Sequence, residues 1–535
     1  MNLQSIDSQA VRSKVDAEYP SAAHVKRFLE VWCSGLYKKE DLLTRPQEIL
    51  DAHHVAIDPS LISVLFESKF LRGKSGKFDL LPPQFDAFRD FMMTKIQWRQ
   101  QIRTGSAPAD PIFREFRERQ IQRCEIELGS DQNTAIVHTP VVFELTRGCS
   151  VKCWFCALDA PPLTGIFDYS PENARFFRDV LRVVKDVIGP ASKWASSYWG
   201  TDPLDNPDQE KFSLDFREIL GMYPQTTTAI PLRAPERTRK LLEVSHASGC
   251  LVNRFSVRTP AQLRKIHDTF SAEELLYTEL VLQNLESDSV KARAGRLIHF
   301  ADDLPKLAAK DEEKLLNMLQ EREPELAAKA TSILINLPGS TEPIIRATSN
   351  ADEEDTSEEY NVSINVPGTT SCLTGFKINM VDRTVELLSP CPANERWPLG
   401  HIVFEEGTFD TAEDLRTLML GMISRNMAER VVPESLVRFV PRLIYREDPE
   451  GFRLGSVFGN GVICHDPTRS AYLHRLGNLL REGKKRAGEI AMLCFYEFGV
   501  PENYTMGSIN NMFHQGIIAE EPIATEAPIA VAAYQ

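Results

Sequence analysis

Three cysteines stand within eight residues of one another, at Cys149, Cys153 and Cys156. A short loop lets all three sulfur atoms converge, and thiolates are the ligands that soft metal centres and iron–sulfur clusters prefer. A structural zinc site needs four ligands, and the closest imidazole, His138, is expected at the far end of the preceding strand. Three cysteines on a four-iron cluster would leave one iron open for chemistry. The spacing therefore favours a cluster, with a zinc-stabilised binding scaffold as the alternative.

Short apolar segments alternate with helical segments around this loop. Strands are expected at 139–146, 194–199, 226–231, 251–257 and 275–282, and helices at 170–181, 207–221, 235–248 and 260–269. A chain that alternates in this way forms a parallel sheet with helices outside, either as a barrel or doubly wound. A sixth strand is expected at 360–366, after a long excursion through 285–359.

The regions on either side of the alternating segment have a different pattern. Five segments are expected: a helical N-terminal domain (1–135), the alternating α/β region (136–370), a hairpin with a helical extension (371–455), a small helix-turn-helix-like unit (456–515) and a disordered tail (516–535). The hairpin is predicted over 375–388, because residues alternate in polarity on both sides of a polar turn near Asp382.

The composition is that of an ordinary folded protein. Of 535 residues, 42% are hydrophobic and 25% are charged, which excludes a collagen, a coiled-coil rod and a largely disordered chain. The net charge of −14 would repel phosphate backbones, so a nucleic-acid partner is not expected. No run of about 18 apolar residues occurs and the first residues are polar, which predicts a cytoplasmic protein with no membrane association.

The cysteine spacing, C-x3-C-x2-C with the aromatic Phe155 before Cys156, resembles that of the radical SAM superfamily. The resemblance covers the alternating region and implies a partial (β/α)6 barrel with chemistry at the carboxyl ends of its strands. It also implies a [4Fe-4S] cluster on Cys149, Cys153 and Cys156, whose open iron chelates S-adenosyl-L-methionine (SAM) next to Phe155. One electron would then cleave SAM to methionine and a 5′-deoxyadenosyl radical.

The same resemblance implies further contacts to SAM. In the family, a turn after the second strand holds the SAM amino group, and here that turn contains Gly200, Thr201 and Asp202. The match is partial, because Thr replaces a Gly and Asp replaces a Glu, but Asp is still an anion for an ammonium group. Ser256 and Arg258 alternate on one face at the end of the fourth strand, where the family contacts the ribose or carboxylate of SAM.

The whole chain resembles the proteusin-type peptide epimerases, which are radical SAM maturases of ribosomally made peptides. The resemblance rests on the chain length, the residues around Cys149, the Ser371–Gly375 loop and the hairpin that ends at Cys391. No grouped cysteines follow Cys156 and no cobalamin domain is apparent, so enzymes with auxiliary clusters are not expected. The alternative function is a radical SAM peptide methyltransferase or cross-linking maturase.

The epimerase resemblance implies a hydrogen donor on the chain. Cys372 fits this role on a loop expected at the mouth of the barrel, above the cluster, with Cys391 as the alternative. The deoxyadenosyl radical would remove Hα from an L-residue, and Cys372 would return hydrogen to the opposite face to leave a D-residue. An external one-electron reductant of the flavodoxin or ferredoxin type would restore the thiol. The leader of the precursor peptide would bind either the N-terminal helical region or the 456–515 unit.

Overall fold

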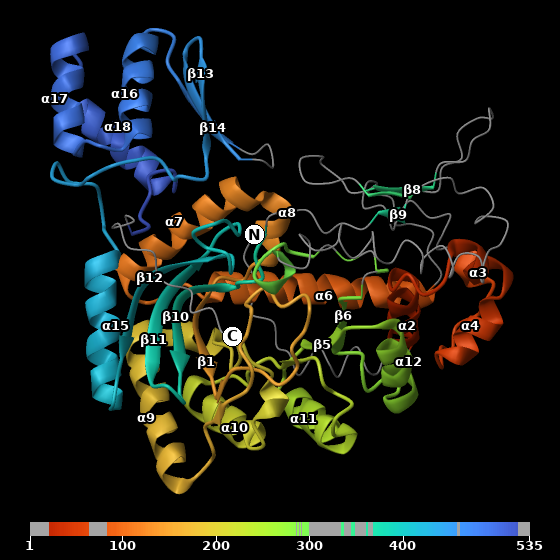
Figure 1. The fold of residues 1–535 in the computed structure, drawn as a ribbon. Coiled ribbons are helices and arrows are strands. Elements are labelled where there is room, and N and C mark those ends of the chain that lie inside the picture. The colour runs from red at the N-terminus through yellow and green to blue at the C-terminus, as the bar shows by residue number, and fades with distance from the viewer. Residues whose placement is uncertain are drawn as a thin grey trace, which may run out of the picture.

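The computed structural model describes most of the chain (Figure 1). The described residues are 21–63, 83–284, 286–287, 289, 291–298, 333–335, 344–347, 360–361, 368–456 and 461–522. Within them, no helix combines the length and the apolar character that crossing a bilayer requires.

Two parallel groups of strands form the centre of the molecule. β1 (Thr139–Glu144) pairs in parallel with β10 (Leu373–Asn379) on one side and with Ser196 through a single bridge on the other. β4 (Thr227–Thr228), β5 (Asn253–Val257) and β6 (Thr278–Leu282) form a second parallel sheet. No sheet in the described part of the chain closes into a barrel. The structure therefore shows a mixed α/β fold, and the expected partial (β/α)6 barrel is not shown.

The helices between these strands lie where the sequence pattern predicts them. They are α9 (Pro171–Ile188), α10 (Gln209–Leu220), α11 (Pro235–Ala247) and α12 (Pro260–Thr269). The start of α9 is fixed locally, because the Ser170 side chain accepts a hydrogen bond from the Asn173 amide and proline occupies the first turn. The expected strand at 194–199 is wrong in extent: 3-10 helix η1 (Gly189–Trp194) precedes a single bridged residue, Ser196.

The expected sixth strand at 360–366 is also wrong. Within it, β9 (Tyr360–Asn361) pairs antiparallel with β8 (Ile344–Ala347), which pairs with β7 (Ile333–Ile335) in a separate sheet. Residues 362–366 lie outside the described part. The strand that runs beside β1 is β10, the first strand of the predicted hairpin.

The hairpin itself is confirmed. β10 and β11 (Thr384–Pro390) are antiparallel, and β12 (His401–Thr408) adds a third antiparallel strand. β1, β10, β11 and β12 thus form one four-stranded sheet. One face of this sheet packs against α7 (Pro111–Leu128), α9 and α15 (Ala412–Asn426) in the largest hydrophobic core of the described residues.

The described N-terminal residues are helical, as predicted. The helices are α2 (Ala22–Cys33), α3 (Lys39–Thr44), α4 (Pro46–Ala52), α6 (Pro83–Gly105), α7 (Pro111–Leu128) and α8 (Ser130–Ala135). Aromatic pairs show how α6 and α7 pack on the α/β body. Trp98 of α6 lies edge-to-face on Trp194 at 5.4 Å, and Phe113 of α7 on Phe376 of β10 at 5.6 Å.

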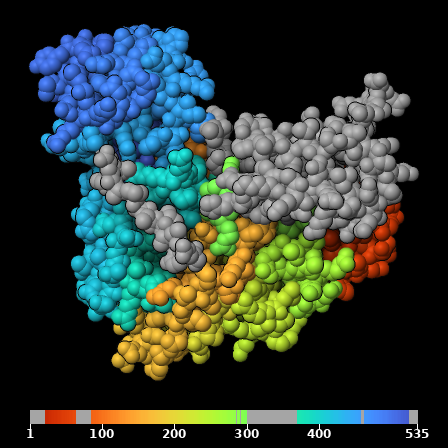
Figure 2. All heavy atoms as spheres, viewed as in Figure 1, coloured from red at the N-terminus to blue at the C-terminus, as the bar shows by residue number. Residues whose placement is uncertain are grey.

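The C-terminal residues form a lobe that stands above the body in Figures 1 and 2. It contains a three-stranded antiparallel sheet, β13 (Ile444–Asp448), β14 (Gly451–Gly455) and β15 (Gly461–His465). Three helices follow: α16 (Ser470–Glu482), α17 (Ala487–Phe498) and α18 (Glu502–His514). The core of the lobe runs from Val431 to Ile518, so the expected boundary at 456 falls inside the lobe.

The expectation of a disordered tail from 516 is wrong for the described residues 516–522. Ile517 and Ile518 are buried in the core of the lobe. Glu520 pairs with Arg119 and Glu521 pairs with Arg442. Buried apolar side chains and ion pairs hold residues 516–522 against the protein. Disorder was predicted because the sequence that follows is rich in Ala and Pro.

Candidate functional site

The cysteine loop begins where β1 ends. The short strands β2 (Thr146–Arg147) and β3 (Gly165–Ile166) pair antiparallel and close the loop at its base. Inside it, the Cys149 amide donates to the Pro161 carbonyl at 2.8 Å. Gly148 has φ +77°, and a Cβ there would lie 2.3 Å from the Pro162 carbonyl oxygen, so the turn into Cys149 requires glycine.

The three thiols are partly buried, and Cys149 and Cys156 lie close enough to Cys153 to act on it electrostatically. Burial raises the pKa of Cys153 to about 12, with further increases from Cys149 and Cys156. Burial likewise raises the pKa of Cys149 to about 11. Cys149 and Cys153 are therefore protonated at neutral pH, and a bound metal would have to displace their protons.

In the described part of the chain, no three His, Cys, Asp or Glu side chains are arranged to hold one metal ion. The donor set of the loop, three clustered thiols, is the set that ligates iron–sulfur clusters, in which each thiolate binds a different iron. Thiolates spread over separate irons need not converge on one point, as the ligands of a lone zinc ion must. Three thiols match in type and number the protein ligands of a cluster with one open iron.

Asp205, in the 3-10 helix η2 (Pro203–Asp205), holds the first part of the cysteine loop. Its carboxylate accepts from the Ser150 amide at 2.8 Å and forms an ion pair with Arg233 at 2.9 Å. Arg233 also donates to the Ser150 hydroxyl at 2.7 Å. Because the Asp205 side chain is fully buried, this network ties the position of the residue after Cys149 to the body of the protein.

Arg296 holds the other end of the loop. Its guanidinium donates to the carbonyls of Cys153 and Ala160, each at 2.9 Å, and its amide donates to the Cys156 carbonyl at 3.0 Å. The preceding Gly295 lies so close that a Cβ there would be 2.3 Å from the Ala157 carbonyl oxygen. The sequence carried no signal for this contact, since Arg296 lies 143 residues after Cys153.

The predicted SAM-binding turn lies beside the loop, but its polar groups already have partners. The Gly200 amide donates to Glu144 at 2.8 Å. The Asp202 carboxylate accepts from the amides of Leu204 and Ala229 and from the Thr228 hydroxyl. Asp202 therefore joins the turn to β4. Burial raises the pKa of Asp202 to about 6.

Glu144 is a site residue that was missed from the sequence. It is buried at the end of β1, and its second oxygen accepts from Asn379 of β10 at 3.1 Å. The signal was present, because a carboxylate closes a strand whose six residues are all buried. A buried charge without an apparent partner in an apolar strand indicates a site or a network.

Arg258 lies close enough to the loop to lower the pKa of Cys153 against the larger effect of burial. The Asp202 carboxylate acts on the same thiol in the opposite direction. The structure therefore brings the loop cysteines, Asp202 and Arg258 to one place, as predicted from the sequence. Ser256 is partly exposed on the same face of β5, Thr201 is partly exposed, and the Phe155 ring lies edge-to-face on Trp154 at 5.5 Å.

His138 lies at the opposite end of β1, as predicted. It is fully buried and contacts Thr374 and Asn133 through its two ring nitrogens, at 2.9 and 3.0 Å. Burial lowers its pKa well below the usual range, so it is a neutral structural imidazole.

Cys372 is not above the cysteine loop, which corrects the expected placement. Its carbonyl accepts from the Thr139 amide at 2.8 Å, so it lies at the amino end of β1 and β10. The cysteine loop follows the carboxyl end of β1. The reason is that residues 373–379 run parallel to β1, which places the residue before them at the opposite edge of the sheet.

Cys372 lines a cavity of about 110 Å³ at this edge. The cavity also contacts Tyr198, Arg254 and Glu279, together with Lys95 and Trp98 of α6. Glu279 pairs with Lys95 at 2.7 Å and with Arg254 at 3.0 Å. Arg254 lies on the same face of β5 as Ser256, opposite to the face that packs on α11 and α12.

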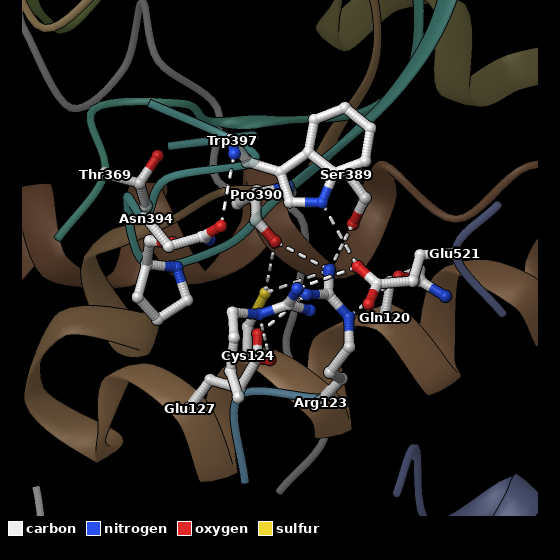
Figure 3. Close-up of polar contacts among 12 residues, drawn as sticks. Gln120, Arg123, Cys124, Glu127, Thr369, Ser389, Pro390, Asn394, Trp397 and Glu521 are labelled. Carbon is white, nitrogen blue, oxygen red and sulfur yellow. Dashed lines mark hydrogen bonds and ion pairs between the residues drawn. The ribbon is translucent and has the colours of Figure 1, made fainter. Parts of the chain in front are cut away.

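Cys391, the alternative donor, lies elsewhere. It is fully buried in the core beside the four-stranded sheet, and burial raises its pKa. The neighbouring Pro390 carbonyl accepts from Cys124 at 3.3 Å and from Arg123 at 2.6 Å (Figure 3). The cavity that Cys372 lines is not lined by Cys391.

Comparisons with known proteins identify one similar protein whose activity its description does not state. No family model matches the sequence, and no solved structure matches it. A Sinorhizobium fredii protein (strain NBRC 101917 / NGR234), described as "Uncharacterized protein y4wI", is 29% identical over 505 residues. The match covers 93% of this chain and 87% of that protein, so the likeness extends over nearly the whole length of both.

Proposed function

We propose that this protein is a radical SAM peptide epimerase that converts L- to D-residues in a ribosomally made precursor peptide. One observation carries the proposal. Arg258, at the carboxyl end of β5, lowers the pKa of the Cys153 thiol in the cysteine loop. Arg254, near the amino end of the same strand face, lines the cavity that Cys372 also lines. The cysteine loop and Cys372 therefore flank opposite ends of one face of β5. About 13 Å of strand separates these two arginines. Inversion requires that one group removes hydrogen from one side of the carbon and that a second group delivers hydrogen to the other side.

Cys149, Cys153 and Cys156 would hold a [4Fe-4S] cluster, with Arg258, Ser256 and the turn at Gly200 beside it. When bound, the cluster and SAM supply a 5′-deoxyadenosyl radical that removes Hα from an L-residue. The substrate residue would lie along the inner face of β5, between Ser256 and Arg254. The Cys372 thiol would then donate a hydrogen atom to the carbon from the side away from the loop.

Replacement of the donor tests the proposal. Cys372→Ala should still cleave SAM and abstract hydrogen, but its yield of D-residues should fall nearly to zero, because the thiol that delivers hydrogen is gone. The measurement is chiral amino-acid analysis of the precursor after anaerobic reaction. Cys250→Ala is the matched control, since Cys250 lines the same cavity. If Cys372→Ala inverts residues normally, Cys372 is not the donor.

Isotope and mass measurements separate epimerisation from the alternative activities. In D2O the wild-type protein should place one deuterium at each inverted α-carbon, because the thiol proton exchanges with solvent. In H2O the mass of the peptide should not change. A mass gain would indicate a methyltransferase, and a loss of hydrogen would indicate a cross-linking maturase.

The leader of the precursor peptide would bind the C-terminal lobe. β15 is an edge strand, and Ile463 on it is 56% exposed. Further apolar side chains are exposed on the helices of the same lobe: Met492, Phe495, Tyr496 and Tyr504. An exposed edge strand that carries an apolar side chain suits an extended peptide that adds as a further strand, and the exposed apolar residues of the helices offer further contact area on the same lobe.

Charge substitutions on the lobe test this partner. Ile463→Asp should weaken binding of a fluorescent leader peptide by about tenfold, because an apolar contact is lost and a charge is placed at the interface. Ile96→Asp on α6 is the control, since Ile96 is 55% exposed in the N-terminal region. Loss of binding in Ile96→Asp alone would assign the leader to the N-terminal helices instead.

A further inference from the structure

Tyr198 occupies the wall of the cavity that Cys372 lines. It follows the bridged residue Ser196, and its phenol reaches across to β4. The phenol oxygen lies 2.8 Å from the Thr227 hydroxyl and 3.3 Å from the Gln225 side-chain amide. Both neighbours donate to it, which leaves the phenol's own proton for another partner.

The surroundings keep Tyr198 protonated. Burial raises its pKa, against the smaller opposing effects of Arg254 and of the Thr227 hydrogen bond, and the negative charge of a Cys372 thiolate would add a still smaller increase. Arg254 is itself held by Glu279 and does not move freely toward the phenol. A neutral phenol that shares a cavity with a thiol can donate a hydrogen atom to its sulfur radical, because O–H bonds of phenols and S–H bonds of thiols have similar strength.

A thiol that donates a hydrogen atom must regain one before it can donate again, and Cys372 cannot supply this hydrogen atom itself. Each inversion would leave the Cys372 sulfur one hydrogen atom short, and the next inversion needs the S–H bond restored. The missing hydrogen atom must come from a group that can reach the sulfur within the cavity that Cys372 lines. Tyr198 is a redox-active side chain on the wall of that cavity.

We propose that Tyr198 restores the Cys372 thiol after each inversion, an inference that rests on the proposed function. The Tyr198 O–H bond breaks and the Cys372 S–H bond forms, which moves the unpaired electron to the tyrosine oxygen. A flavin or iron–sulfur electron carrier then supplies one electron and water supplies one proton, which re-form the phenol. Arg99 and Lys193, both partly exposed, line the cavity where this electron and proton would enter.

The test counts D-residues per enzyme molecule with reconstituted, full-length protein, excess peptide and SAM, and reduced flavodoxin. The wild-type protein should form many D-residues. Tyr198→Phe should form up to one per molecule in a rapid burst and then stop, because the first thiol is present but is not restored. Tyr223→Phe is the matched control, since Tyr223 is a buried tyrosine that lines the same cavity, and it should continue like the wild type.

Two results would overturn the inference. If Tyr198→Phe continues past the first turnover like Tyr223→Phe, the tyrosine does not restore the thiol. If Tyr198→Phe lacks even the burst, Tyr198 positions the substrate or supports the fold instead. A wild-type protein that forms no D-residue would refute the proposed function itself, a result distinct from either of these.

Discussion

At the residue scale, the position of the three thiols depends on side chains from other parts of the chain. Arg296 bonds to carbonyls at both ends of the Cys153–Ala160 segment and forms an ion pair with Asp159 at 3.0 Å. Hydrogen bonds from a charged donor contribute about 1.5–3 kcal/mol each. A loop that must present three sulfurs together is therefore sensitive to one arginine outside it.

Arg296→Gln should lower the iron bound after anaerobic reconstitution severalfold, because the carbonyl contacts that fix the loop are weakened. Iron and sulfide analysis measures this, and far-UV circular dichroism should be unchanged. Arg217→Gln, at an exposed position on α10, is the control and should bind iron like the wild type. Full iron loading in Arg296→Gln would show that the loop is ordered without this contact.

At the scale of elements, a buried histidine pair joins the N-terminal helices to the α/β body. His53, at the end of α4, lies 2.9 Å from His267 of α12, measured between their Nδ1 atoms. Burial, with a smaller contribution from His267, lowers the pKa of His53 to about 3. Burial also lowers the pKa of His267. Both imidazoles are therefore neutral in the folded protein near neutral pH.

This pair should make the contact sensitive to acid. Below about pH 6.5 the unfolded chain binds a proton at His53 that the folded chain does not, so stability falls as the pH drops toward 3. Between pH 6.5 and pH 5 the loss is roughly 2 kcal/mol. The free energy of unfolding, measured with urea, should differ less between pH 7 and pH 5 for His53→Gln than for the wild type. His54→Gln, on an exposed neighbour, should retain the full difference.

At the scale of the whole molecule, buried ion pairs connect the C-terminal lobe to α7. Arg119 pairs with Glu520 at 2.7 Å, and Arg442 pairs with Glu127 at 2.6 Å and with Glu521 at 2.7 Å. Figure 3 shows Glu127 and Glu521, the two acidic partners of Arg442, on either side of the Arg123 side chain. These contacts tie residues near the end of the chain to the helix that covers the four-stranded sheet.

Glu520→Gln should destabilise the protein by about 3 kcal/mol, because it leaves the buried Arg119 guanidinium without a counter-charge. The expected result is a lower Tm and faster proteolysis between the lobe and the body. Glu502→Gln, at an exposed position at the start of α18, is the control. An unchanged Tm in Glu520→Gln would mean that the apolar core of the lobe holds it in place without the ion pairs.

The sequence by itself determined the features that depend on near neighbours in the chain. The three cysteines follow the first strand, α9 begins at its Ser170 cap, and the chain turns back between β10 and β11, all as predicted. Each depends on residues a few positions apart, whose spacing and capping chemistry act locally.

The tertiary structure alone decided which distant segments meet. β10, and not the 360–366 segment, runs beside β1, and this pairing moves Cys372 to the opposite end of the sheet from the cysteine loop. Arg296 reaches the loop, and Glu520 reaches Arg119, across long stretches of chain. An apolar strand has the same sequence pattern whichever strand it pairs with, so the pattern does not name the neighbour. A charged residue is likewise the same residue in the sequence whether it is exposed or buried against a distant ionic partner.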